Sequence, residues 1–274
     1  FGRGSEEAEC LAEAGIPFEV VPGVPSAVAA TAYAGISLTH RRYASSVAYV
    51  TGVESVEKQD SAHDWKRLAT GVQTLVIFMG LRRLDSVMQR LIENGRSPSC
   101  PVAVISRASL PQQRTVVGSV ESIAEKTREA GIVPPALIVV GEVVHLRKSL
   151  RWFDTQPLFG KRVLITRPAG MASEMAAALR EAGAAPMCHP TILIVPPSER
   201  GPLDEAASSA RDQDWVILTS VNGVNALFES IASQGGDARW LGGPKVAAIG
   251  PATAQALQNH GIRADLVPDT YRGE

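Results

Sequence analysis

Cysteine and clustered histidine are scarce in this chain, and their scarcity excludes several kinds of site. The three cysteines among its 274 residues lie far apart and show no CxxC spacing. Neither a zinc site nor a disulfide framework is therefore predicted, and buried apolar positions suit these side chains better. The histidines form no i, i+4 pair, so the sequence predicts no metal. The cysteines are Cys10, Cys100 and Cys188, and the histidines are His40, His63, His145, His189 and His260.

Long apolar runs and a strong net charge are also lacking. No apolar stretch of the sequence reaches the ~18 residues that a membrane-spanning helix needs, and no signal or transit segment is recognisable. The formal net charge of -1 gives no general attraction to nucleic acid or to an anionic membrane. We therefore expect a soluble cytoplasmic protein that holds any anionic ligand through local groups.

What is present is an alternation of short apolar runs with helical stretches. With 45% hydrophobic residues the chain is able to bury substantial cores, and its length suggests about two domains. Alternation of this kind predicts an α/β fold rather than a bundle or a sandwich. In the first half the expected strands are 47–51, 74–79, 102–105, 114–118 and 137–140, and the expected helices are 6–14, 84–93 and 119–130.

The pattern breaks near residues 154–160 and then starts again. Residues 161–168 read as a charged and then apolar strand that ends in a turn, the usual opening of a new βαβ series. We therefore predict a linker at 154–160. Beyond this first strand at 161–168 we expect strands near 191–195, 215–219 and 245–249, and helices near 173–182, 203–211, 224–233 and 252–260.

The most distinctive stretch lies between Phe18 and Ala34. A buried strand is expected at 18–21, a turn at Pro22-Gly23, and a helix built almost wholly of alanine after Pro25. Small residues at the carboxyl end of a strand let a ligand approach the backbone. The pattern on its own fits a binding turn and a simple packed strand-turn-helix equally well.

Several ordered blocks of residues 1–144 carry a likeness together with this stretch. The blocks are Phe1-Gly2-Arg3-Gly4-Ser5-Glu6-Glu7, Ala44-Ser45-Ser46-Val47-Ala48-Tyr49-Val50-Thr51-Gly52, Phe78-Met79-Gly80, Pro101-Val102-Ala103-Val104-Ile105-Ser106-Arg107 and Pro135-Ala136-Leu137-Ile138-Val139-Val140-Gly141-Glu142-Val143-Val144. Together they resemble uroporphyrinogen-III C-methyltransferases, which make precorrin-2 from uroporphyrinogen III with S-adenosylmethionine. Ordered blocks form a far more specific match than one short motif.

This resemblance implies an S-adenosylmethionine site formed by Pro25, Ser26, Met79, Ala108 and Ala136. Pro25 departs from the family, which commonly has Thr-Ala at this turn, and so lacks a backbone donor and a hydroxyl. Met79 matches a methionine that contacts the cofactor, although without the resemblance it reads as a core residue. Small residues such as Ala108 and Ala136 are often only packing. A homodimer through this half is also implied, and no catalytic acid or base is identified.

Three blocks of the second half also carry a likeness, namely Val163-Leu164-Ile165-Thr166-Arg167-Pro168, Asp214-Trp215-Val216-Ile217-Leu218-Thr219-Ser220-Val221-Asn222-Gly223-Val224 and Val246-Ala247-Ala248-Ile249-Gly250-Pro251-Ala252-Thr253-Ala254. With these blocks the second half resembles the first part of uroporphyrinogen-III synthases. The implied reaction closes and rearranges hydroxymethylbilane to uroporphyrinogen III.

The ligands of that family carry many carboxylates, which helix N-termini attract through free N–H donors and a partial positive charge. Two turns, 219–223 and 250–253, each follow an expected strand and begin a helix, so both are expected at the carboxyl edge of one sheet. Alternatively, Ser220 and Thr253 are only helix N-caps. The candidate substrate-binding residues are Arg167, Thr219, Ser220, Asn222, Gly250 and Thr253.

Two basic positions each have two possible interpretations, contact with an acidic substrate or exposure to solvent. Arg167 either pairs with a substrate carboxylate or ends its strand in solvent. The run His40-Arg41-Arg42 either faces an acidic substrate or forms a solvated loop.

The fold class predicted for the whole chain is therefore α/β, with tetrapyrrole-methylase-like domains followed by a partial doubly wound, flavodoxin-like synthase region. Residues 1–42 would end the N-terminal methyltransferase subdomain, 43–153 form its C-terminal subdomain, and 161–274 begin the synthase. Because Phe1 opens in the middle of a family motif, we expect a fragment incomplete for both activities. The alternatives are a remnant that binds ligand or dimerises without catalysis, and a methylase of another corrinoid precursor.

Overall fold

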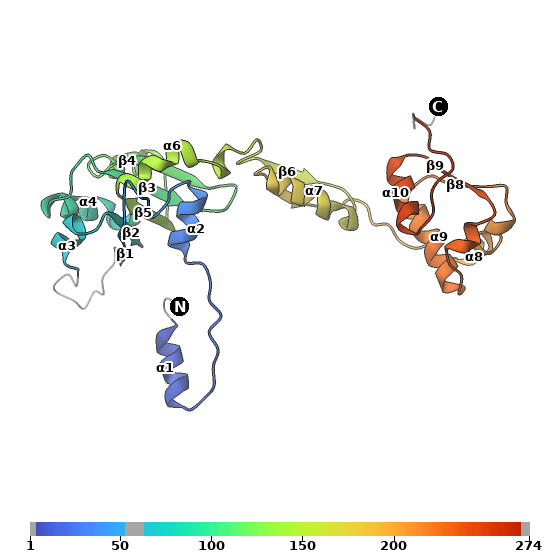
Figure 1. Cartoon of the computed structure of the whole chain (residues 1–274), viewed down its shortest axis with the longest axis horizontal. Coiled ribbons are helices and arrows are strands. Elements are labelled where there is room, and N and C mark those ends of the chain that lie inside the picture. Colours follow the sequence, from blue (N-terminus) through green and yellow to red (C-terminus); the bar gives the residue numbers. More distant parts are fainter. Residues whose placement is uncertain (1–3, 53–62, 270–274) are drawn as a thin grey trace. The chain divides into compact units, whose positions relative to one another are not determined.

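The computed structural model describes residues 4–52 and 63–269, which leaves out Phe1 to Arg3 of the first family-like block. The chain divides into two compact units, Phe1–Leu193 and Ile194–Glu274. Figure 1 follows the elements of both units along the chain.

A five-stranded mixed sheet forms the centre of the first unit, with the strand order β1-β2-β5-β3-β4. Strands β1 and β2 run parallel, and the other neighbouring pairs run antiparallel. The five strands expected between residues 47 and 140 are confirmed. They are β1 (Val47–Thr51), β2 (Thr74–Phe78), β3 (Pro101–Ser106), β4 (Arg114–Ser119) and β5 (Ala136–Val140).

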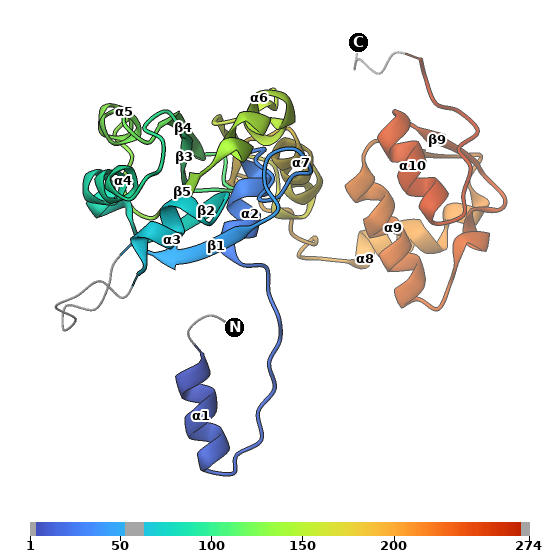
Figure 2. The same ribbon diagram turned by 60° about the vertical axis from the view of Figure 1, so that its left-hand side comes forward.

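The side chains of the inner strands alternate between two cores on opposite faces of the sheet. On β2, Leu75 and Ile77 belong to one core and Val76 to the other. Helices cover both faces (Figure 2): α3, α4 and α5 supply residues to the first core, and α2 supplies residues to the second. Strands buried on both faces read as continuous apolar runs, which explains why the sequence located them. The helices are α2 (Ser26–Tyr33), α3 (Trp65–Thr70), α4 (Leu84–Glu93) and α5 (Ile123–Glu129).

The buried strand expected at 18–21 is wrong. The chain between α1 (Ser5–Glu13) and α2 is extended and exposed, and the side chain of Val21 is 84% exposed. A strand needs a neighbour to satisfy its backbone N–H and C=O groups, and none of the strands in the described ranges pairs with this segment. The two expected helices on either side of it, by contrast, are both present as α1 and α2.

The segment that follows the sheet is anchored to the end of α2. Elements η2 (Glu142–Leu146), α6 (Arg147–Leu150) and η3 (Phe153–Thr155) lead out of β5. The buried Arg147 donates to the carbonyl of Ala34 and to the carboxylate of Asp154, which also accepts from Arg151. The predicted linker at 154–160 therefore starts on a buried ion pair, and the domain boundary placed there stays a prediction.

A smaller βαβ element completes the first unit. It consists of β6 (Arg162–Ile165), α7 (Ala169–Glu181) and β7 (Ala185–Cys188), with the two strands parallel. The strand expected at 191–195 is wrong, since β7 takes the place beside β6 and Leu193 is 82% exposed. Strand β7 was not among the expected strands, and Pro186 lies within it. In a sheet of two strands each strand is an edge, where the missing N–H of a proline is tolerated.

The second unit contains a parallel pair, β8 (Trp215–Leu218) and β9 (Lys245–Ala248). One core joins these strands to α8 (Gly201–Ser208), α9 (Val221–Ser233) and α10 (Pro251–Asn259). Short 3-10 turns η4 (Ala210–Asp212) and η5 (Ala238–Leu241) precede the two strands. The mixed α/β class predicted for the chain is confirmed. Among the helices that the structure describes, none is both long and apolar enough to cross a membrane.

The buried ion pair predicts a pH-dependent contribution to stability. The side chains of Arg147 and Asp154 are only 10% and 11% exposed. Burial on its own would raise the pKa of Asp154, but the hydrogen bonds and charges of Arg147 and Arg151 outweigh it and hold that pKa below the ordinary value of an aspartate. A carboxyl whose pKa is lowered by folding stabilises the protein above its unfolded pKa, and this contribution disappears as the pH falls through the lowered pKa.

We expect Asp154→Asn to lower the free energy of unfolding by about 3 kcal/mol at neutral pH, because Arg147 loses its buried counter-charge. The difference from the wild type should shrink as the pH falls below 4, which urea titrations at several pH values would measure. The control is Asp85→Asn, which breaks an exposed pair with Arg128 and should cost less than about 1 kcal/mol. Equal losses in the two variants would contradict the prediction.

Candidate functional site

A pocket of about 620 Å³ lies at the end of the central sheet of the first unit. Four of the five residues predicted to contact a cofactor line it, namely Ser26, Met79, Ala108 and Ala136. Pro25, the fifth, precedes Ser26 as the N-cap of α2 and is not among the lining residues. The remaining lining residues are Ala30, Phe78, Leu81, Arg82, Ile105, Arg107, Pro134, Pro135 and Leu137.

Strand register explains why these distant residues meet. Strand β5 lies between β2 and β3 and runs antiparallel to both. Ser106 at the end of β3 pairs with Ala136 at the start of β5, so Ala108 lies beside the same end of the sheet. Ile77 pairs with Ile138, and the same register continued two residues further brings Met79 opposite Ala136. The N-terminal end of α2 closes the pocket with Ser26 and Ala30.

Two of the lining residues hold an unusual backbone conformation. Met79 has a φ of 53° and Arg107 a φ of 50°, in the left-handed region that residues other than glycine seldom enter. Such residues cost about 1–3 kcal/mol each and gather where ligands bind. Met79 is also 55% exposed, so the alternative interpretation of Met79 as a core residue is wrong. The turn after β2 therefore presents a methionine side chain at the pocket.

The charge of the pocket comes from arginine. Arg82 and Arg107 are the only charged residues among the described lining residues, and the rest of the lining is mostly apolar. A flat apolar ligand with an anionic end fits this combination, and the volume is typical of a small-molecule site. Sequence reasoning missed both arginines. Arg107 ends the family-like block that begins at Pro101 and directly precedes Ala108. This position in the sequence could have indicated that Arg107 lies at the pocket.

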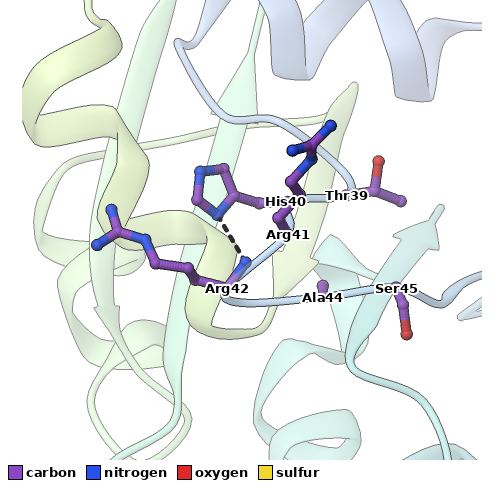
Figure 3. Close-up of a pocket in the computed structure, with 6 residues that line it drawn as sticks. All are labelled: Thr39, His40, Arg41, Arg42, Ala44 and Ser45. Atoms are coloured by element: carbon purple, nitrogen blue, oxygen red, sulfur yellow. Dashed lines mark hydrogen bonds between the residues drawn. The ribbon is translucent and has the colours of Figure 1, made fainter.

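A second, more open hollow surrounds the basic run. It has a volume of about 780 Å³ and is lined by Thr39, His40, Arg41, Arg42, Ala44 and Ser45. Figure 3 shows the side chains of Arg41 and Arg42 pointing away from each other, while the backbone N–H of Arg42 donates to Nδ1 of His40 at 3.2 Å. The turn is thus held by its own histidine and offers two guanidinium groups to anions.

The second unit brings two helix N-termini to one sheet edge, as predicted. Leu218 pairs with Ala248 at the ends of β8 and β9, and each strand leads into a helix. Ser220 is the N-cap of α9, and its Oγ accepts from the backbone N–H of Gly223 at 3.0 Å. Gly250 is the N-cap of α10. This edge presents free backbone N–H donors, which suit anions.

The other predicted substrate-binding residues differ in their exposure and in the unit to which they belong. Thr219 and Asn222 are exposed beside Ser220. Thr253 is 5% exposed within α10, and because Gly250 is the N-cap, the reading of Thr253 as a cap is wrong. Arg167 is exposed after β6 and belongs to the first unit, whereas the other five belong to the second.

The cysteines differ from expectation. Cys100 is buried, and burial raises the pKa of its thiol, but Cys10 and Cys188 are exposed, so the expectation of burial is wrong for those two. No group of three or more His, Cys, Asp or Glu side chains within 4–52 and 63–269 is arranged to hold a metal ion.

Two classes of enzyme match this chain in succession. Residues 1–124 match the family of tetrapyrrole (corrin/porphyrin) methylases, and residues 173–274 match uroporphyrinogen-III synthase HemD. A methylase-like segment thus precedes a synthase-like segment.

Individual relatives agree with both assignments. The chain is 40% identical over 275 residues to the porphyrin biosynthesis protein HemD of Ruminiclostridium josui, covering 100% of this chain and 54% of that protein. It is 47% identical over 156 residues to a uroporphyrinogen-III C-methyltransferase of Bacillus subtilis (strain 168), covering 57% of this chain and 60% of that protein. The chain therefore spans less than two thirds of these relatives.

A solved structure is also similar. It is a uroporphyrin-III C-methyl transferase from Thermus thermophilus complexed with S-adenyl homocysteine, 40% identical, with a TM-score of 0.45. The likeness covers 53% of this chain and 62% of that one.

The cap at Ser220 predicts a local loss of stability. Ser220→Ala leaves the N–H of Gly223 without its acceptor and should lower the free energy of unfolding of the second unit by about 1 kcal/mol. Ser220→Asp restores an acceptor and should recover most of that loss in urea unfolding. A Ser220→Ala variant as stable as the wild type would show that the cap contributes nothing.

Proposed function

We propose that the methylase-like half binds S-adenosylmethionine in the 620 Å³ pocket and takes part in its transfer of methyl to uroporphyrinogen III, giving precorrin-2. The observation that carries the proposal is the meeting of Ser26, Met79, Ala108 and Ala136, from four separate segments, around one pocket. The name of the Bacillus subtilis relative supports the same reaction.

The residues of the pocket suit this ligand. Ala108 and Ala136 leave room for a flat base, and the thioether of Met79 packs well on an aromatic ring. The guanidinium groups of Arg82 and Arg107 attract the carboxylate of the amino-acid end. When bound, S-adenosylmethionine supplies an electrophilic methyl group. The protein's part in such an in-line displacement is chiefly to position the two reactants.

The basic turn at His40-Arg41-Arg42 supports an acidic acceptor. Its two guanidinium groups match the carboxylates of uroporphyrinogen III. Methylation of another corrinoid precursor is less favoured, because the same chain carries a synthase-like segment whose family makes uroporphyrinogen III. Incubation with S-adenosylmethionine and uroporphyrinogen III without oxygen, followed by mass spectrometry, tests the reaction. Binding without turnover would favour a ligand-binding remnant.

Filling the pocket should abolish cofactor binding. Ala136→Trp places an indole where the base would lie, so we expect calorimetry to detect no binding of S-adenosylhomocysteine, with the circular dichroism spectrum unchanged. The matched control is Ala177→Trp, on an exposed position of α7, which should bind like the wild type. Unchanged affinity in Ala136→Trp would place the cofactor elsewhere.

The synthase-like half binds the carboxylates of hydroxymethylbilane and uroporphyrinogen III at the edge formed by Thr219, Ser220, Asn222 and Gly250. Helix N-termini on parallel strands at this edge support the proposal. Arg167 and Thr253 remain candidates from the resemblance to synthases. The reaction is tested with hydroxymethylbilane, from which spontaneous closure gives type I and the enzyme gives type III uroporphyrinogen.

Reversing the charge preference of this edge should weaken ligand binding. Asn222→Asp keeps the shape of the side chain, suits the first turn of a helix and repels an anion. We expect the dissociation constant for uroporphyrinogen III to rise about three- to tenfold at low salt, and less at high salt. Asn225→Asp, exposed one turn further along α9, is the control. Equal effects of the two changes would contradict a site at the N-terminus.

Three further points belong to the same proposal. The protein acts in the cytoplasm, it forms a homodimer through the methylase-like half, and a linker at 154–160 joins the two halves. Each is an expectation that accompanies the enzyme families. Sedimentation measures the dimer, and limited proteolysis at 154–160 tests the linker.

A further inference from the structure

A buried glutamine connects two walls of the pocket without lining it. Gln113 is 4% exposed and precedes β4. Its Oε1 accepts from the backbone N–H of Ser109 at 3.0 Å, and its Nε2 donates to the carbonyl of Tyr33 at 3.1 Å. Both polar atoms of the amide are thereby satisfied, as a buried side chain requires.

The first of these bonds holds a strained loop. Ser109 has a φ of 67° and Arg107 a φ of 50°, so left-handed residues flank Ala108. Backbone conformations of this kind persist only where surrounding contacts fix them. The N–H of Ser109 bonds to Gln113, and the N–H of Gln113 bonds in turn to the carbonyl of Leu110 at 2.8 Å. Gln113 thus fixes the conformation that places Ala108 and Arg107 at the pocket.

The second bond holds α2, whose other end supplies Ser26 and Ala30. Tyr33 is the last residue of α2, where carbonyl groups lack partners within the helix. Gln113 therefore bridges the loop after β3 and the helix that closes the pocket. Its two hydrogen bonds fix the distance between them.

Resting on the proposed function, we propose that Gln113 is a positioning residue for the cofactor, which sets the distance between the Ala108 loop and α2 without touching the ligand. Its loss widens the pocket and lets the loop leave its left-handed conformation. Binding of the cofactor then has to reorder both walls, which lowers affinity.

The test measures binding of S-adenosylhomocysteine to the whole chain by calorimetry, together with the midpoint of thermal unfolding. Gln113→Leu removes both hydrogen bonds, and we expect the dissociation constant to rise about tenfold or more. The matched control is Gln112→Leu, because Gln112 is the exposed neighbour, and it should bind like the wild type.

The variant Val87→Ala distinguishes a general loss of stability from a loss of positioning. Val87 is buried in α4 on the other face of the sheet, outside the pocket. This variant should unfold at a lower temperature, as Gln113→Leu does, yet bind with unchanged affinity. If the two variants lose stability alike and both bind like the wild type, the positioning role is overturned.

Gln113→Glu gives a second measurement should the leucine variant fold poorly. The ionised carboxylate has no proton to donate to the Tyr33 carbonyl, whereas its protonated form has one donor and one acceptor, as glutamine does. The ratio of the affinity of this variant to that of the wild type, both measured at the same pH, should rise towards one as the pH falls. A constant ratio would overturn the proposal. If the wild type binds no S-adenosylhomocysteine, the proposed function and this inference are both overturned. If the wild type binds it and only the variants give a contrary result, this inference alone is overturned.

Discussion

The methylase-like unit depends on one constraint, the antiparallel pairing of β5 with strands on both of its sides. This strand is almost wholly buried, so its backbone groups have to be satisfied by β2 and β3. Antiparallel pairing brings the ends of both neighbours to the start of β5. The turns after β2 and β3 therefore meet there, and the pocket forms from segments far apart in sequence.

The helix that closes this pocket is fixed from its opposite end. Three successive carbonyls, of Ala32, Tyr33 and Ala34, accept from the side chains of Trp152, Gln113 and Arg147. The last turn of a helix lacks internal partners for its carbonyls, and these side chains supply partners for Tyr33 and Ala34 and an additional one for Ala32. Helix α2 packs on the second core with short side chains such as those of Ala27 and Ala30, and these bonds further restrict how it moves against the sheet. Residues of the segment that follows β5 thus help to hold the helix that closes the pocket.

The synthase-like half relies on a different device. Strands β8 and β9 of the second unit are parallel, so both carboxyl ends lie at one edge and both following helices begin there. Partial positive charge is concentrated at that edge without any lysine or arginine in the two turns. This positive charge is local, and it exists although the overall formal charge of the chain is -1.

Elements with a local signal can be located from the order of amino acids. Continuous apolar runs specified the inner strands, and the alanine-rich stretch and Ser220 specified where helices begin. The apolar runs at 18–21 and 191–195 look the same in sequence, but a strand exists only where a partner satisfies its backbone, and pairing is not a local property. Tertiary structure alone decided that Thr253 is buried, that Met79 and Arg107 are strained at the pocket, and that Gln113 rather than Gln112 is enclosed. These outcomes depend on contacts between residues distant in sequence, which the order of amino acids encodes but no short window of it displays.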